Sequence, residues 1–264
     1  MDTPRISASS YSNTAPLVWS FLYGANHGKV EIILDNAPAR SAELLAQGRV
    51  DAALVPVIAS QFIDGVKLVR DVCVGARERV RSVCLVTRGA DLADVRSVSL
   101  DTSSRTSVVL TKLIFREFLG FEPAWRDSAP DINSMLGESD AALIIGDPAL
   151  ALSRSADPAV KVFDLAEVWH EHTGLGFIFA MWMTRRDKSP IDLAAARDEG
   201  LEHLDEIAAN YHGEIGLGKE EMLIYLSENI SYSPDDSMRS GMELYFKLAA
   251  KSGLIETVRE TVFV

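Results

Sequence analysis

The sequence GRVDAALVP, residues 48–56, begins with a glycine and ends in a short apolar run that is typical of a buried parallel strand. Residues 137–145, GESDAALII, repeat this pattern 89 positions later. A second pair of segments matches at nearly the same offset, because ISASSYSNT at 6–14 aligns with VSLDTSSRT at 98–106. In each half a strand therefore runs into a turn rich in Ser and Thr and then a helix, and a second strand ends nearby. The two matches together predict an internal repeat.

Strand-like and helix-like segments alternate through both halves. The first half predicts strand, helix, strand, helix and strand at residues 4–10, 16–24, 30–35, 41–48 and 51–56. The second half predicts strand, helix, short helix and strand at residues 96–101, 107–120, 132–139 and 140–147. Such alternation predicts an α/β fold with parallel sheets. Because ligands bind beyond the carboxyl ends of parallel strands, where both turns lie, we expect two lobes with a ligand cleft between them.

The rest of the chain is predicted to complete the first lobe. FIFAMWMTR at 177–185 is a strand-like run, and Ser-Pro pairs at 189–190 and 233–234 mark the starts of helices after it. No further strand is predicted, so these helices are expected to cover lobe one.

We therefore expect lobe one to comprise residues 1–88 and 178–264, and lobe two to comprise residues 89–177. The two segments in which the chain passes between the lobes would form a hinge, with Gly89, Gly174 and Gly176 supplying backbone freedom.

Composition excludes several classes of protein. The 264 residues carry a formal net charge of −12, which argues against nucleic acid as a partner. An anionic ligand would need local hydrogen-bond donors, because the overall field repels it. No apolar run reaches the ~20 residues of a membrane span, and Met1 to Ser9 lacks a signal-peptide pattern, so we expect a cytoplasmic protein without membrane insertion. Cys73 and Cys84 lie in apolar, strand-like runs and are predicted to be buried thiols.

Six ordered motifs carry a specific resemblance. They are SYSNTAPL, VDAALVPVIASQF, VRSVCLVT, SLDTSSRTSVVL, DAALIIGDPAL and DLAEVWHEHTGLGFIFAMW, and together they resemble the chorismate dehydratase family of the futalosine route to menaquinone. The sister dihydroxynaphthoate synthases show a Cys-Pro-Asn-Asp type of first turn and a histidine after an isoleucine pair. Here the first turn reads Ser-Asn-Thr-Ala-Pro and the later position is Gly146-Asp147, which favours the dehydratase.

The resemblance implies a two-lobed fold of the periplasmic-binding-protein type II kind and a cytoplasmic setting. It also implies conversion of chorismate to 3-[(1-carboxyvinyl)oxy]benzoate and water without a cofactor or metal. The paired turns favour a small ligand with two carboxylates, or with one carboxylate and several hydroxyls, and chorismate has two carboxylates. Its ring carboxylate acidifies the hydrogen on the ether-bearing carbon through the adjacent alkene, and the neighbouring hydroxyl can then leave. The enzyme must mainly orient the molecule and stabilise the developing charge.

Candidate site residues follow from the motifs. We expect Asn13 to be the catalytic amide, and the protein's alternative to a substrate carboxylate as the base is Asp147. Thr106 and Ser107 are expected to cradle a carboxylate with backbone N–H groups. The full set expected to bind substrate is Ser10, Tyr11, Thr14, Ser82, Ser103, Ser104, Arg105, Thr106, Ser107 and Gly146.

Each candidate has a structural alternative. Capping of the first helix, with no role in binding, is the alternative for Asn13, Ser10, Tyr11 and Thr14. Arg105 could instead pair with Asp101, and Asp147 could be an ordinary N-cap.

Two other patterns are interpreted structurally. His170 and His172 are spaced as zinc ligands but are expected in a surface loop, and GEIGLGKEE at 213–221 is expected to be a turn that starts a helix rather than a phosphate loop. For the whole chain, a non-catalytic cytoplasmic binder of an aromatic or cyclic dicarboxylate stays open as the alternative function.

Overall fold

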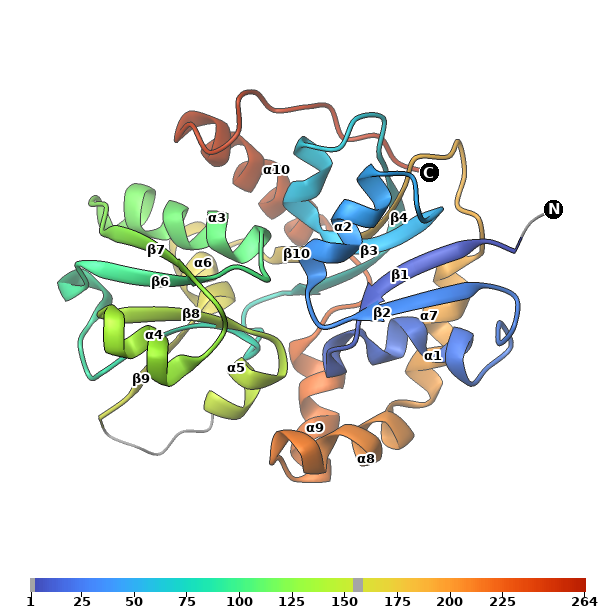
Figure 1. Cartoon of the computed structure of the whole chain (residues 1–264), viewed down its shortest axis with the longest axis horizontal. Coiled ribbons are helices and arrows are strands. Elements are labelled where there is room, and N and C mark those ends of the chain that lie inside the picture. The colour runs from blue at the N-terminus through green and yellow to red at the C-terminus, as the bar shows by residue number, and fades with distance from the viewer. Residues whose placement is uncertain (1–2, 154–158) are drawn as a thin grey trace. The chain divides into compact units, whose positions relative to one another are not determined.

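The computed structural model describes residues 3–153 and 159–264, which form two compact units (Figure 1). Unit 1 comprises Met1–Gly75, Ile178–Asp235 and Arg259–Val264, and unit 2 comprises Ala76–Phe177 and Asp236–Val258. The chain therefore passes between the units four times rather than the expected two.

Unit 1 is built on a five-stranded sheet in the order β2-β1-β3-β10-β4. Its strands are β2 (Glu31–Asp35), β1 (Arg5–Ser9), β3 (Ala52–Pro56), β10 (Phe177–Thr184) and β4 (Lys67–Ala76). β1 pairs in parallel with β2 and β3, whereas β10 is antiparallel to β3. Every residue of β3 is buried, which is the burial expected of a central strand covered on both faces.

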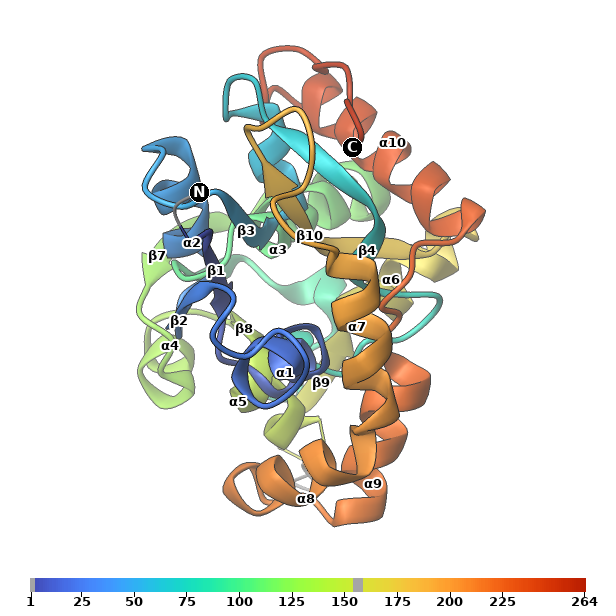
Figure 2. The ribbon, with the colours of Figure 1, turned by 90° about the vertical axis from the view of Figure 1, so that its right-hand side faces the viewer.

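The helices of unit 1 come from both ends of its sequence. After a 3₁₀ turn (Ser12–Thr14), α1 (Ala15–Leu22) packs against α7 (Leu193–Glu202), as Figure 2 shows. α2 (Pro38–Ala46) packs on β1 and β3. α8 (Leu204–Ile215) and α9 (Lys219–Ile224) follow α7, and α9 continues as a π-helix over Tyr225–Asn229.

Unit 2 repeats this sheet in the order β7-β6-β8-β5-β9. Its strands are β7 (Ala124–Ser128), β6 (Ser97–Asp101), β8 (Ala141–Ile145), β5 (Val83–Thr87) and β9 (Lys161–Asp164). β6 is parallel to β7 and β8, and β5 runs antiparallel to β8 and β9. β1 and β6 thus hold the same place in their sheets, as do β3 and β8, which confirms the internal repeat that the sequence predicts.

The core of unit 2 lies between its sheet and its helices. α4 (Ile132–Glu138) and α5 (Gly146–Leu152) cover a cluster that includes Cys84, Met135 and Ile144. α3 (Thr106–Leu113), continued as a π-helix over Ile114–Leu119, packs with α6 (Leu165–Thr173) and α10 (Asp236–Lys251). Cys73 and Cys84 are fully buried free thiols, as predicted.

Two predicted features of the domain organisation are wrong. The first boundary was expected at residue 88, but unit 2 begins at Ala76 because β5 hydrogen-bonds within its sheet. The helix at Asp236–Lys251 was expected to cover lobe one, but it belongs to unit 2, where the rings of Trp169 and Phe177 pack against Tyr245 of α10. Gly89 consequently lies inside unit 2 and not at a crossing.

Candidate functional site

The first expected site turn, in unit 1, is held together by its own hydroxyl groups. Thr14 Oγ1 donates to the carbonyl oxygens of Ser9 at 2.6 Å and Tyr11 at 2.8 Å. Ser10 Oγ donates to Asn36 Oδ1 at 2.5 Å, which ties the turn to the chain that follows β2. Ser10 and Thr14 therefore stabilise the turn through hydrogen bonds of their own, whether or not they also touch a ligand.

Asn13 is different from its neighbours. Only 9% of the residue is exposed, yet its side chain makes no hydrogen bond to any residue that the structure describes. It is not a helix cap either, since Tyr11 and Thr14 hold the N-cap positions of the 3₁₀ turn and α1, and neither makes a side-chain capping bond. The capping alternative is therefore wrong for Asn13, Tyr11 and Thr14. An amide offers two donor hydrogens and an acceptor oxygen, so Asn13 keeps its full capacity for a ligand.

The second turn, in unit 2, follows β6. The Asp101 Oδ1 atom accepts hydrogen bonds from the N–H of Ser103 at 2.8 Å and from its Oγ at 2.6 Å. Ser104 Oγ accepts from the N–H of Ser107 at 3.3 Å, within the first turn of α3. Tyr245 on α10 donates its hydroxyl to the carbonyl oxygen of Thr106 at 3.0 Å. The turn is thus fastened to β6 at one end and to α10 at the other.

Asp101 is a residue that the sequence suggested only as a partner for Arg105. That pair does not form: Oδ1 binds Ser103, and Oδ2 is buried with no hydrogen-bond partner among the described residues. The residue is 1% exposed, and this burial raises the pKa of its carboxyl, while the hydrogen bonds from Ser103 lower it by less. The available signal was its position, as the last residue of a strand before a turn rich in Ser and Thr.

Ser82, Gly146 and Asp147 meet where β8 ends and β5 begins. The register pairs Val83 with Ile145, and the N–H of Gly146 donates to the carbonyl oxygen of Ser82 at 2.8 Å. Gly146 has a φ of 69°, a left-handed conformation that suits glycine. Asp147 is half-buried in the first turn of α5 and is not the N-cap, because Ile145 holds that position. Ser82 is wholly buried, and its Oγ donates to the carbonyl oxygen of Val80 at 3.4 Å.

The sheet direction brings these elements of unit 2 to one edge. β6 and β8 are parallel and β5 is antiparallel to β8, so the carboxyl ends of β6 and β8 lie beside the amino end of β5. That edge carries Ser82, the turn of Ser103–Ser107, and Gly146–Asp147. The equivalent edge of unit 1, at the carboxyl end of β1, carries the turn with Asn13.

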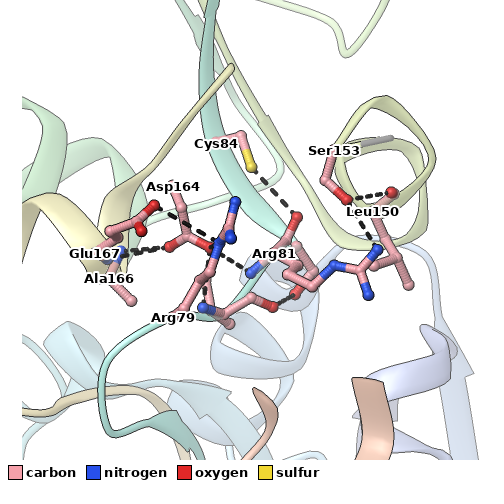
Figure 3. Close-up of polar contacts among 10 residues, drawn as sticks. Arg79, Arg81, Cys84, Leu150, Ser153, Asp164, Ala166 and Glu167 are labelled. Carbon is pink, nitrogen blue, oxygen red and sulfur yellow. Dashed lines mark hydrogen bonds and ion pairs between the residues drawn. The ribbon is translucent and has the colours of Figure 1, made fainter. Parts of the chain in front are cut away.

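One further carboxylate at the same edge was not predicted. β9 ends at Asp164, and this side chain accepts hydrogen bonds from four backbone N–H groups, two of them in the segment that leads into β5 (Figure 3). Burial raises the pKa of the Asp164 carboxyl, and the four N–H groups oppose that rise. An aspartate before a helix predicts only an N-cap, so the second pair of bonds has no sequence signal.

The two histidines are not in a loop, contrary to expectation. His170 and His172 lie in the last turn of α6, where His172 Nδ1 is 2.9 Å from the carbonyl oxygen of Val168 and its ring stacks on Phe118 at 4.6 Å. Within residues 3–153 and 159–264, no three His, Cys, Asp or Glu side chains gather as metal ligands would. At Lys219 the expected helix start is confirmed, because α9 begins there after Gly218.

Comparison with known proteins gives a consistent result. A family model described as menaquinone biosynthesis matches residues 4–251. A chorismate dehydratase of Thermus thermophilus is 31% identical over 236 residues, which cover 81% of this chain and 84% of that protein.

Solved structures show the same fold at low sequence identity. A protein of Archaeoglobus fulgidus has a TM-score of 0.69 at 18% identity, covering 96% of this chain and 98% of its own. The periplasmic aliphatic sulphonate binding protein of Escherichia coli has a TM-score of 0.64 at 15% identity, covering 99% and 93%. A Candida albicans protein described as having the generic periplasmic binding protein fold has a TM-score of 0.69 at 12% identity, covering 98% and 92%. The expected periplasmic-binding-protein type of fold is thereby confirmed. In the described part of the chain, no helix has the length and apolar character needed to cross a bilayer.

Proposed function

Since this chain belongs to the menaquinone biosynthesis family, we propose that it is a chorismate dehydratase, a hydro-lyase that converts chorismate to 3-[(1-carboxyvinyl)oxy]benzoate and water. The Thermus thermophilus relative that bears this name supports the proposal. So does the first turn, which has Ser-Asn-Thr-Ala-Pro in place of the cysteine-containing turn of the sister enzymes.

The observation that carries the mechanism is the uncommitted amide of Asn13. The reaction breaks the C–H bond on the ether-bearing carbon, and that electron pair moves into the ring as the neighbouring C–O bond breaks. The departing hydroxyl takes up a proton and leaves as water. A neutral donor suits this step, because it can stabilise the developing negative charge or the leaving oxygen without adding charge to a dianionic substrate. Asn13 is buried, uncharged and free of structural hydrogen bonds to the described residues.

The turn after β6 is proposed to bind one substrate carboxylate. It supplies the N-terminal N–H groups of α3, where the helix dipole favours an anion, together with the cationic side chain of Arg105. Local donors of this kind are needed because the chain carries a net charge of −12. The hydrogen bonds from Ser103 to Asp101 and from Tyr245 to Thr106 hold these donors in place before substrate arrives. This lowers the entropic cost of orienting the substrate.

The base in this proposal is a carboxylate of the substrate, with Asp147 as the protein's alternative. Asp147 is half-buried at the start of α5, on the edge of unit 2 that carries the other candidates. Asp147→Asn separates the two routes. If Asp147→Asn keeps the parent turnover, the base that removes the proton is the substrate carboxylate. If the variant still binds chorismate but loses turnover, the base is Asp147.

The experiment mixes purified protein with chorismate and follows the ultraviolet absorbance of the cyclohexadiene. Mass spectrometry then identifies the product. We expect the absorbance to fall and the product to weigh one water less than chorismate. A protein that gains thermal stability with chorismate but leaves it unchanged would be the non-catalytic binder, and the proposal would be wrong.

A cytoplasmic location is part of the same proposal. Fractionation of cells that express the full gene, with detection by antibody, is expected to recover the chain with cytoplasmic markers.

A further inference from the structure

Arg81 has a backbone conformation that arginine rarely adopts. Its φ is 62°, and within the described ranges it is the one non-glycine residue with a positive φ. A side chain with a Cβ atom is disfavoured there and persists only where its surroundings impose it. Arg81 lies in the segment between β4 and β5, directly before Ser82.

Asp164 is the side chain that binds the backbone of this turn (Figure 3). The Arg81 carbonyl oxygen also accepts from Cys84 Sγ at 3.3 Å, and Arg79 Nε lies 3.9 Å from Asp164 Oδ2. Oδ2 accepts from the N–H of Val80 at 3.0 Å and from the N–H of Arg81 at 2.5 Å. Oδ1 accepts from the N–H groups of Ala166 at 2.9 Å and Glu167 at 3.2 Å, which caps α6. One side chain therefore joins the start of α6 to the left-handed turn.

The turn leads directly to the edge of unit 2 that carries the candidate site. The carbonyl oxygen of Ser82, one residue beyond Arg81, accepts the N–H of Gly146 at 2.8 Å. Gly146 is the first residue of α5, and Asp147 follows it. Two hydrogen bonds and one residue of backbone thus connect Asp164 to the first turn of α5.

We propose that Asp164 is a positioning residue: by holding Arg81 in the left-handed conformation it fixes the Ser82 carbonyl and, through it, the Gly146–Asp147 turn for the reaction. This proposal rests on the function proposed above. Asp164 itself is 3% exposed, and its oxygens are bound to backbone N–H groups and face Arg79 Nε at 3.9 Å, so it acts through the turn and does not touch substrate.

The first variant is Asp164→Asn. Asparagine caps helices as well as aspartate does, so it can keep Ala166 and Glu167 satisfied through its oxygen. Its NH₂ group then faces the N–H groups of Val80 and Arg81 and cannot accept from them. We expect kcat to fall by about tenfold or more, with a smaller change in KM, because the turn is misplaced while the substrate carboxylates are still bound.

Rescue provides the decisive comparison. Glycine adopts a positive φ without a steric penalty, so Arg81→Gly added to Asp164→Asn should restore most of the lost turnover. Arg81→Ala added to Asp164→Asn is the matched control, because it removes the same guanidinium but keeps a Cβ. It should not restore turnover. Equal effects of the two substitutions would overturn the proposal.

Hydrogen exchange tests the same inference without relying on turnover. The Gly146 N–H should exchange faster in Asp164→Asn than in the parent protein. Adding Arg81→Gly to Asp164→Asn should slow this exchange again, whereas adding Arg81→Ala should leave it fast. If Asp164→Asn does not fold, Asp164→Ser serves instead, because serine can cap α6 but is too short to reach Arg81. Unchanged exchange at Gly146 would overturn the positioning role. If the variants show this exchange pattern but the parent protein leaves chorismate unchanged, the positioning role is supported and the proposed function is wrong.

Discussion

The carbonyl oxygen of Pro16 in α1 faces the α-carbon of Gly200 in α7, and a Cβ at position 200 would lie 1.8 Å from that oxygen. A helical glycine normally weakens a helix, so its presence here is explained by the close approach of the two helices. α1 begins directly after the turn that carries Asn13, so this contact also fixes where that turn lies.

Gly200→Ala is therefore expected to push α1 and α7 apart and to lower the free energy of unfolding by roughly 1–3 kcal/mol. Chemical denaturation measures the change. Gly213→Ala is the matched control, because Gly213 lies in α8 and a Cβ added there would have nothing within 4 Å, so alanine should stabilise by roughly 0.5–1 kcal/mol. Equal stability changes at the two positions would contradict the packing argument.

Asn13→Ala should leave the melting temperature nearly unchanged, because the Asn13 side chain caps no helix, whereas Asn13→Asp should lower it, because it places a carboxylate at a buried position. Turnover of chorismate should fall by about 10²- to 10³-fold in each, since a donor to the developing charge is lost and aspartate also adds a negative charge. Asn210→Ala, at an exposed position of α8, is the control and should keep the parent rate. Near-parent turnover in both Asn13 variants would show that this amide takes no part in the reaction.

Asp101→Asn should change how stability depends on pH. Burial raises the pKa of the Asp101 carboxyl in the folded chain. Between about pH 4 and that raised value, the folded chain keeps a proton that the unfolded chain has released. The stabilisation is therefore complete below the unfolded pKa and is lost as pH rises through the folded pKa.

Asparagine has no proton to lose, so the melting temperature of Asp101→Asn relative to the parent should increase from pH 4 to pH 7. Thermal unfolding of both proteins at several pH values and constant ionic strength measures this difference. A pH-independent difference for Asp101→Asn would mean that the carboxyl titrates alike in both states.

Tyr245→Phe removes the hydroxyl that donates to the Thr106 carbonyl oxygen at the start of α3. The expected loss is roughly 0.5–1.5 kcal/mol of unfolding free energy, which is the net contribution of a typical buried hydrogen bond. Denaturant unfolding gives the value, and Tyr23→Phe is the control since Tyr23 is 70% exposed. KM for chorismate should rise as well, because α3 begins at Thr106 and supplies the proposed carboxylate cradle. A stability loss with unchanged KM would remove the α3 turn from substrate binding.

Local patterns in the sequence were sufficient for the central strands and the turns that follow them. β1, β3, β6 and β8 are apolar runs beside Ser- and Thr-rich or glycine-containing turns, and their period and composition are properties of neighbouring residues. The positions of the candidate turns, at the carboxyl ends of parallel strands, followed from this alternation alone. β7 and β9 lie at the edges of the unit 2 sheet with few buried residues, so they carry too little apolar pattern to be recognised.

Contacts between distant segments decided the rest. An amphipathic helix such as α10 shows that it has an apolar face, but only packing of Tyr245 on Trp169 and Phe177 shows that unit 2 receives it. Likewise, Asp164 and Arg81 are 83 positions apart, and nothing near either residue predicts a left-handed arginine held by a buried carboxylate. The reason is physical: periodicity and capping arise from interactions within a few residues, whereas hydrogen-bond partners across a fold exist only after the sheet has set the strand register.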